Sequence, residues 1–191
     1  MARIDELLLV RHGKPLCDYR TKISGCDFGR WVATYEDAPL DPSFAPPDEF
    51  AAQVARFRCL LTSTKRRAIE SAALVAPDRP RISDPLFNEA AIPTRFRARV
   101  ALAPEHWDGI VRIAWMLGWS GGVESITAAK TRAVRAANHL AGLASTYGSV
   151  VLFGHGMINT LIVRELRRNG WIGTGTPRAY WGRVILNKAI Q

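Results

Sequence analysis

Two histidines follow apolar stretches that have the length and composition of buried strands. His12 comes after the unbroken Leu-Leu-Leu-Val run of residues 7–10, and Arg11 stands directly before it. His155 lies between two glycines after the apolar residues 150–153. Continuous apolar runs are typical of strands covered on both faces in a parallel sheet, where ligands bind at the carboxyl ends of the strands. We therefore expect the two histidines to converge there on one anion.

A third candidate group of residues opens a predicted helix. Lys65, Arg66 and Arg67 are consecutive, and they follow the hydroxyl residues 62–64 at the end of a short apolar run. Cations in a first helical turn oppose the helix dipole and cost roughly 0.3–1 kcal/mol unless an anion lies nearby. The placement indicates either a bound anion or a basic helix start that only water surrounds.

One carboxylic acid lies in an apolar segment. Glu89 is flanked by Leu86, Phe87 and the apolar residues 90–92, and desolvation in such surroundings favours the protonated form that a general acid needs. A surface glutamate in a loop is the alternative. Glu124, which follows two glycines before a helix cap, is the competing carboxylate.

The elements that position these residues alternate between strands and helices. Apolar periodicity predicts helices over residues 49–57, 104–118, 125–147 and 158–168, and one more helix that begins near residue 65. Besides the two strands that precede the histidines, it predicts strands at 58–62 and 181–186. Residues 173–177, Gly-Thr-Gly-Thr-Pro, lack the lysine of a phosphate-binding P-loop and are interpreted as a turn. The order strand, loop, helix, strand predicts an α/β protein.

The charge of the chain indicates anionic partners. Lys and Arg number 26 against 17 Asp and Glu, which leaves +9. This charge fits phosphorylated metabolites, nucleic acid or an acidic membrane surface. The basic residues are spread from Arg3 to Lys188 rather than gathered in one run, which disfavours nucleic acid.

The length and the cysteines of the chain indicate how many domains it has and in which compartment it works. The 191 residues are interpreted as one domain, 1–191, and a homodimer is compatible with them. Cys17, Cys26 and Cys59 have no paired spacing, so we expect neither a disulfide framework nor a zinc site, and a cytoplasmic location fits best. We expect no signal peptide and no membrane span.

Taken together, the motifs resemble the histidine phosphatase superfamily, in the branch similar to phosphoglycerate mutases and small-molecule phosphatases. The resemblance runs from residue 7 to about residue 166. It rests on Arg11-His12-Gly13, Thr62-Ser63 with Arg67-Ala68 beyond, Glu89, the Gly-Val-Glu124-Ser125 segment, and Gly154-His155-Gly156, in this order. It implies a phosphoglycerate mutase-like fold, a three-layer α/β/α sandwich with a mostly parallel central sheet.

The resemblance also implies a role for each matched residue. His12 is expected to be the nucleophile that forms a phosphohistidine, and Glu89 the proton donor to the leaving oxygen and then the base that activates water. Arg11, Arg67 and His155 are expected to bind the phosphoryl oxygens, with Ser63 and Gly156 also at the substrate. The implied activity is a metal-independent phosphatase without a cofactor, acting on a phosphorylated small molecule.

The sequence departs from the pattern of the superfamily in three places. Lys14-Pro15 replaces residues that often include a phosphate-binding threonine, so a fourth phosphate ligand is not identified. Arg67 is chosen over Arg66 by its spacing alone. The phosphoglycerate-binding segments of true mutases are not recognisable, which favours hydrolysis. The alternatives are a phosphoglycerate mutase-type phosphotransferase and a non-catalytic protein that binds anions or nucleic acid.

Overall fold

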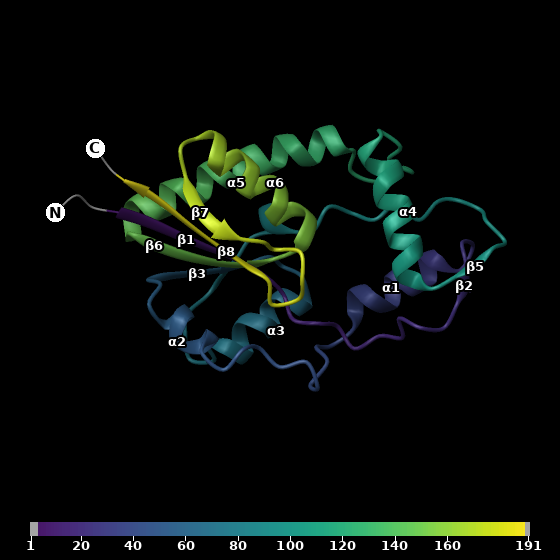
Figure 1. The fold of residues 1–191 in the computed structure, drawn as a ribbon, viewed down its shortest axis with the longest axis horizontal. Coiled ribbons are helices and arrows are strands. Elements are labelled where there is room, and N and C mark those ends of the chain that lie inside the picture. The colour runs from purple at the N-terminus through teal and green to yellow at the C-terminus, as the bar shows by residue number, and fades with distance from the viewer. Residues whose placement is uncertain (1–3, 190–191) are drawn as a thin grey trace.

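A mixed sheet forms the centre of the fold (Figure 1). The computed structural model describes residues 4–189, and within them the main sheet has six strands in the order β4-β3-β6-β1-β8-β7. These strands are β1 (Ile4–Arg11), β3 (Cys59–Thr62), β4 (Ile82–Ser83), β6 (Ser149–Gly154), β7 (Ile172–Gly175) and β8 (Arg183–Ala189). β1, β6, β3 and β4 pair in parallel, whereas β8 is antiparallel to β1 and β7 is antiparallel to β8. The predicted mostly parallel sheet is confirmed.

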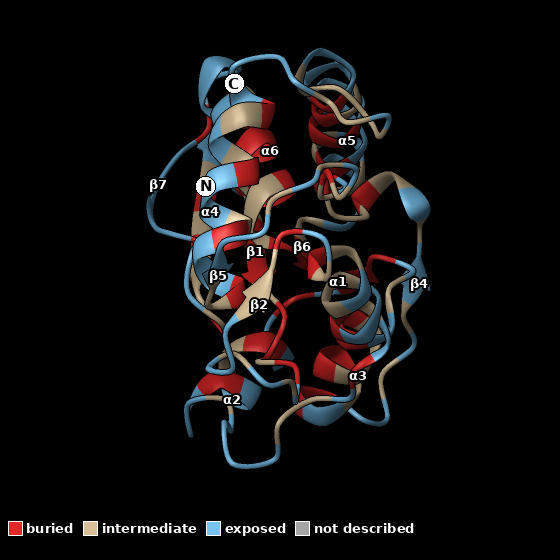
Figure 2. Cartoon of the chain, turned by 90° about the vertical axis from the view of Figure 1, so that its right-hand side faces the viewer, coloured by how far each residue is buried: buried red, intermediate tan, exposed pale blue. Residues whose placement is uncertain are grey.

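Helices cover both faces of this sheet (Figure 1). One face is covered by α5 (Ile126–Tyr147) and α6 (Gly156–Arg168), and the other by α2 (Phe50–Ala55) and α3 (Arg66–Val75). The predicted three-layer α/β/α arrangement is therefore confirmed. Buried residues occupy the sides of α5 and α6 that face each other and the sheet, while their outer sides are exposed (Figure 2). No helix among residues 4–189 is both long and apolar enough to cross a membrane.

The apolar run of β1 explains why the strand is central. Leu7 and Leu9 belong to the core packed under α5 and α6, whereas Leu8 and Val10 belong to the core on the side of α2 and α3. All four side chains are fully buried, because successive side chains of a strand point to opposite faces and both faces are covered. The sequence prediction of a strand buried on both faces is confirmed.

A smaller group of elements gathers beyond one end of the sheet (Figure 1). It consists of α1 (Phe28–Asp37), α4 (Pro104–Met116) and the antiparallel pair β2 (Ile23–Ser24) and β5 (Ala101–Leu102). Phe28, Trp107 and Val111 form its core. A short 3-10 helix, η1 (Pro85–Phe87), precedes the loop that carries Glu89. These elements lie beyond the carboxyl ends of β1 and β6, where the site is predicted.

Two predicted elements differ from the structure near the C-terminus. Residues 173–177 are not a plain turn, because Ile172–Gly175 forms the edge strand β7 paired with β8. Gly-Thr-Gly-Thr has a weak strand signal, and the partner strand that supplies its hydrogen bonds comes later in the chain. The last strand spans Arg183–Ala189, so the prediction of 181–186 began two residues too early.

Candidate active site

The register of the sheet places the two histidines side by side. β1 and β6 pair in parallel with Arg11 opposite Gly154, so His12 and His155 are the next residues on the two strands. Their ring centroids lie 5.0 Å apart, and both side chains are almost fully buried. Val10 and Phe153, each two residues before a histidine, belong to the core on the α3 side of the sheet. Because side chains two residues apart in a strand point to the same face, both imidazoles point toward that side as well.

Hydrogen bonds indicate which nitrogen of His12 can react. Its Nδ1 lies 2.7 Å from the carbonyl oxygen of Gly13, which can only accept, so Nδ1 carries the proton and donates it. Nε2 then holds a lone pair, and the Nε–H of Arg67 donates to it at 3.1 Å. In this tautomer Nε2 is the nucleophilic atom, and a guanidinium lies directly beside it.

Arg67 and Arg66 point in opposite directions from the start of α3. Arg67 is buried, with its Nη2 donating to Glu36 Oε1 at 3.0 Å, while its buried Nη1 has no hydrogen-bond partner within the described residues. Arg66 is exposed and pairs with Glu70 Oε1 at 2.5 Å. The structure therefore brings Arg67 to His12 and leaves Arg66 on the surface.

His155 is oriented by Ser63. Ser63 Oγ lies 2.7 Å from His155 Nε2 and also accepts the backbone N–H of Lys65 at 3.2 Å, which favours donation of the hydroxyl proton to Nε2. This leaves the proton of the imidazole on the buried Nδ1, which has no partner among residues 4–189. Ser63 thus contacts the site through His155, and the Nδ1 proton is available to an oxygen of a ligand.

Arg11 lies beside His12 and is held by the segment between β7 and β8. Its Nη1 donates to the carbonyl oxygen of Arg178, and its guanidinium carbon lies 4.2 Å from the ring centre of Tyr180. Its buried Nε has no partner in the part of the chain that the structure describes. Gly156 lies next to Arg11, since a Cβ added at this glycine would be in ordinary van der Waals contact with the Arg11 side chain, at 3.5 Å.

The side chain of Glu89 contacts the first turn of α6, and its surroundings differ from those expected. Glu89 Oε1 accepts the backbone N–H groups of Ala90 at 3.0 Å and Ile158 at 2.9 Å, and Oε2 accepts that of Met157 at 3.1 Å. The carboxyl group therefore contacts polar N–H groups, and the expectation of an apolar environment was wrong. The apolar neighbours in the sequence turn elsewhere, as Phe87 does into the core. The loop still brings Glu89 to the residues that directly follow His155.

The competing carboxylate is occupied by a different partner. Glu124 forms a bidentate pair with Arg132, with nitrogen–oxygen distances of 2.8 and 2.6 Å. Arg132 also donates to the carbonyl oxygens of Leu86 and Asn88, so the pair ties α5 to the loop before Glu89. This arrangement gives Glu124 a structural contact rather than a place beside His12.

Three side chains at the site have no clear signal in the sequence. Glu36 on α1 pairs with both Arg67 and Lys65, Tyr35 lies 4.9 Å below the Arg67 guanidinium, and Tyr180 packs on Arg11. Burial by itself raises the pKa of Glu36, but Arg67 and Lys65 bring it below its usual value. None of the three stands next to a motif, so only their contacts identify them.

Lys14 and Pro15 provide no hydroxyl group at the site. The Nζ of Lys14 lies 3.7 Å from Asp41 Oδ2 and faces the rings of Tyr19 and Phe44. The carbonyl oxygen of Pro15 accepts the Tyr19 hydroxyl at 2.9 Å. Within residues 4–189, no group of three or more His, Cys, Asp or Glu side chains is placed to hold a metal ion.

Burial and cations keep both imidazoles neutral. Desolvation is the largest cause that lowers the pKa of His12, followed by Arg67 and Arg11, although the hydrogen bond to Gly13 opposes the shift. Desolvation likewise lowers the pKa of His155, together with His12, Arg67 and Arg11. Both rings are therefore unprotonated at neutral pH, as a nucleophile must be.

The lowered pKa values predict that the protein loses stability in mild acid. A histidine with a depressed pKa in the folded state contributes its full stabilisation above about pH 6.5, its unfolded value, and loses it as the pH falls below that value. Each histidine can contribute up to about 1.4 kcal/mol per pH unit to this loss. We expect the free energy of unfolding in urea to fall from pH 7.5 to pH 5.5, and His155→Gln to reduce the slope.

The exposed His106 provides the control for this measurement. His106→Gln makes the same change of side chain at an exposed position on α4, outside the candidate site. It should reduce the slope less than His155→Gln does. A slope that is equal in His155→Gln and in the wild type would contradict the prediction for His155.

The fold resembles those of several solved phosphatases and of a phosphoglycerate mutase. The chain is 19% identical to a phosphoserine phosphatase from Entamoeba histolytica, with a TM-score of 0.60 over 94% of this chain and 89% of that one. It is 17% identical to a mycobacterial glucosyl-3-phosphoglycerate phosphatase, with a TM-score of 0.59 over 97% and 91% of the two chains. It is also 17% identical to phosphoglycerate mutase from Bacillus anthracis, with a TM-score of 0.59 over 100% and 93%.

No protein-family model and no curated protein matches the sequence. At identities this low, the likeness to solved structures establishes the fold. That fold is the phosphoglycerate mutase-like fold that the sequence predicts, so the predicted fold is confirmed.

Proposed function

We propose that this chain is a metal-independent phosphatase of the histidine phosphatase superfamily, which hydrolyses phosphomonoesters through a phosphohistidine on His12. One observation carries the proposal. His12 Nε2 accepts a hydrogen bond from Arg67, the His155 ring lies 5.0 Å from the His12 ring, and one buried nitrogen each of Arg11, Arg67 and His155 has no partner in the described part of the chain. Buried donors are rarely left unpaired, and three of them around one nucleophile suit the oxygens of a phosphoryl group.

The first step transfers the phosphoryl group to the enzyme. His12 Nε2 attacks phosphorus, so that an N–P bond forms while the P–O bond to the leaving group breaks. A phosphoryl oxygen replaces Nε2 as the acceptor of the Arg67 Nε–H, and the donors of Arg11 and His155 stabilise the charge on the other oxygens. The leaving oxygen takes a proton from Glu89. Glu89 Oε2 accepts a single backbone hydrogen bond, so it keeps a lone pair that can carry this proton.

The second step returns the enzyme to its starting state. A water molecule attacks the phosphorus of the phosphohistidine and gives a proton to Glu89, and the N–P bond breaks. Phosphate leaves, His12 is neutral again, and Glu89 is protonated for the next turnover. One carboxyl group therefore acts first as an acid and then as a base.

The substrate is proposed to be a phosphorylated small molecule. Two of the similar structures are phosphatases whose names specify phosphoserine and glucosyl-3-phosphoglycerate, and a third is a phosphoglycerate mutase. Phosphotransfer to an acceptor remains the alternative to hydrolysis, and a requirement for a bisphosphoglycerate primer separates the two. Three further predictions from the sequence remain predictions: a single domain over 1–191, a possible homodimer and a cytoplasmic location.

Turnover of p-nitrophenyl phosphate in the presence of excess EDTA tests the proposed activity. We expect release of p-nitrophenol that the chelator does not reduce, because the proposed mechanism stabilises the phosphoryl oxygens with arginine and histidine. Turnover that EDTA abolishes and Mg²⁺ or Zn²⁺ restores contradicts the metal-independent mechanism. Binding of phosphate without any turnover supports the non-catalytic alternative.

A comparison of substrates with good and poor leaving groups tests the role of Glu89 as an acid. In Glu89→Gln we expect kcat/KM for an alkyl phosphate to fall roughly 10²–10⁴-fold, the usual contribution of general acid catalysis, and that for p-nitrophenyl phosphate to fall much less. Nitrophenolate leaves with little help from an acid, whereas an alkoxide needs a proton. We specify kcat/KM because it reports the steps up to the departure of the leaving group and excludes the later hydrolysis of the phosphohistidine.

Glu124→Gln is the comparison for this experiment. Because Glu124 pairs with Arg132, we expect its loss to affect stability and to reduce kcat/KM for both substrates by similar factors. A selective loss on the alkyl phosphate in Glu124→Gln, with an equal loss on both substrates in Glu89→Gln, assigns the acid to Glu124 instead.

A further inference from the structure

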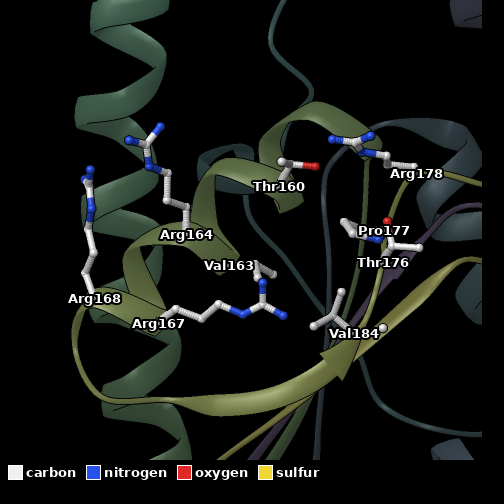
Figure 3. Close-up of a pocket in the computed structure, with 10 residues that line it drawn as sticks. Thr160, Val163, Arg164, Arg167, Arg168, Thr176, Pro177, Arg178 and Val184 are labelled. Atoms are coloured by element: carbon white, nitrogen blue, oxygen red, sulfur yellow. The ribbon is translucent and has the colours of Figure 1, made fainter.

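A groove outside the candidate active site lies between α6 and the β7–β8 segment (Figure 3). Its volume is about 720 Å³. Arginines dominate its lining, together with two threonine hydroxyls and a few apolar side chains. The lining residues used in the argument are Thr160, Arg164, Arg167, Arg168, Thr176 and Arg178. We call this region the arginine groove.

Most of the positive charge in the arginine groove is not neutralised. Arg168 pairs with Glu165 at 2.6 Å. Among residues 4–189, no carboxylate lies within ion-pair distance of Arg164, Arg167 or Arg178. Like charges held together in a concave surface repel one another and attract anions, since the low-dielectric walls concentrate their field. Arginine also offers a planar fork of donors that matches phosphate oxygens.

The dimensions of the arginine groove favour a small molecule. A volume of about 720 Å³ falls within the range of ligand and cofactor sites, roughly 300–1,000 Å³. Arginines come from both walls, with Arg164 and Arg167 on α6 and Arg178 in the segment after β7, and Figure 3 shows Arg178 across the groove from Thr160. Several guanidinium groups around one cavity of this size match a compact molecule with more than one phosphate group.

The segment 176–182 connects the arginine groove with the candidate active site. The side chain of Arg178 lines the groove, while its carbonyl oxygen accepts a hydrogen bond from Arg11. Tyr180 packs on Arg11, and the ring of Trp181 packs so closely on Gly13 that an added Cβ would lie 2.5 Å from it. An anion bound by Arg178 would therefore contact the same segment that positions Arg11 and the backbone next to His12.

We propose that the arginine groove is a second anion-binding site, which binds a small, multiply phosphorylated molecule and influences the active site through the segment 176–182. The site goes beyond the proposed function, because its occupancy can be measured whether or not the chain turns over a substrate.

Calorimetric titration with methylenediphosphonate tests the binding site. This probe carries two phosphonate groups, and its P–C–P linkage cannot be hydrolysed. We expect Arg164→Ala/Arg167→Ala to weaken binding at least tenfold. The control Arg58→Ala/Arg135→Ala removes the same charge from exposed positions outside the groove and should change the dissociation constant less than twofold. Arg67→Ala, which alters the active site, should retain the binding that the groove provides.

Three outcomes of the titration overturn the proposal. Equal weakening in the two double variants shows a general attraction to the positive chain. Loss of all binding in Arg67→Ala alone places the probe in the active site. A single-stranded RNA oligonucleotide that binds more tightly than the probe, and loses affinity in Arg164→Ala/Arg167→Ala, makes the groove part of a nucleic-acid surface.

A kinetic measurement tests the connection to the active site. We expect methylenediphosphonate to change kcat for p-nitrophenyl phosphate in the wild type in a way that saturating substrate does not reverse. This response should be absent in Arg164→Ala/Arg167→Ala. Purely competitive inhibition that persists in this double variant overturns the connection, because the probe then acts where the substrate binds.

Discussion

His12→Ala is expected to abolish turnover of p-nitrophenyl phosphate and to prevent transfer of phosphate from substrate to protein. The substitution removes Nε2, the atom proposed to form the N–P bond, and enzymes that lose their nucleophile fall by roughly 10⁴-fold or more in kcat. Acid quenching should trap a labile phosphohistidine in the wild type and none in the variant. Phosphorylated His12→Ala protein would show that another residue is the nucleophile.

Two further variants separate loss of chemistry from loss of structure. His12→Asn keeps a side-chain oxygen that can accept the Arg67 hydrogen bond, so the site should fold while the phosphorylated intermediate is still missing. His106→Ala removes an exposed imidazole on α4 and should retain both turnover and labelling. Circular dichroism of the three variants verifies that the helices and strands are intact.

Arg67→Ala is expected to reduce kcat/KM by roughly 10³-fold, near the upper end for the loss of one oxyanion donor. The Nε–H of Arg67 donates to His12, and its buried Nη1 has no partner within the described residues. The neighbouring Arg66 is the matched control, since Arg66→Ala removes the same charge from the same helical turn but breaks an exposed contact with Glu70. Its kcat/KM should stay within about threefold of the wild type, because exposed ion pairs contribute little.

The pH dependence gives a second readout for Arg67. After desolvation, Arg67 is the largest cause that lowers the pKa of His12, so its removal should raise that pKa toward the ordinary value. Because the proposed mechanism requires neutral His12, the acid limb of kcat/KM should then move to higher pH in Arg67→Ala. A merely structural role of Arg67 predicts lower activity with an unchanged acid limb. A larger loss in Arg66→Ala than in Arg67→Ala would show that the sequence spacing selected the wrong arginine.

The sequence by itself determined the parts of the fold and of the site that depend on local pattern. An unbroken apolar run identifies β1 as a strand covered on both faces, and a histidine at the end of each of two parallel strands must reach the same edge of the sheet. Such inferences succeed because side chains repeat every two residues in a strand and about every 3.6 in a helix. The choice of Arg67 over Arg66 comes from the motif of the superfamily that the sequence resembles, and the structure buries Arg67 on α3.

Only the tertiary structure decided which groups the site residues contact. The carboxyl group of Glu89 is surrounded by the N–H groups of Met157 and Ile158, far along the chain, and not by its apolar neighbours in the sequence. Glu36 reaches Arg67 from a different helix, and the residues 172–175 become a strand only because β8 supplies their hydrogen bonds. The physical reason is that periodicity fixes the direction of a side chain within its own element, whereas electrostatic surroundings and edge-strand pairing depend on partners that folding brings from elsewhere.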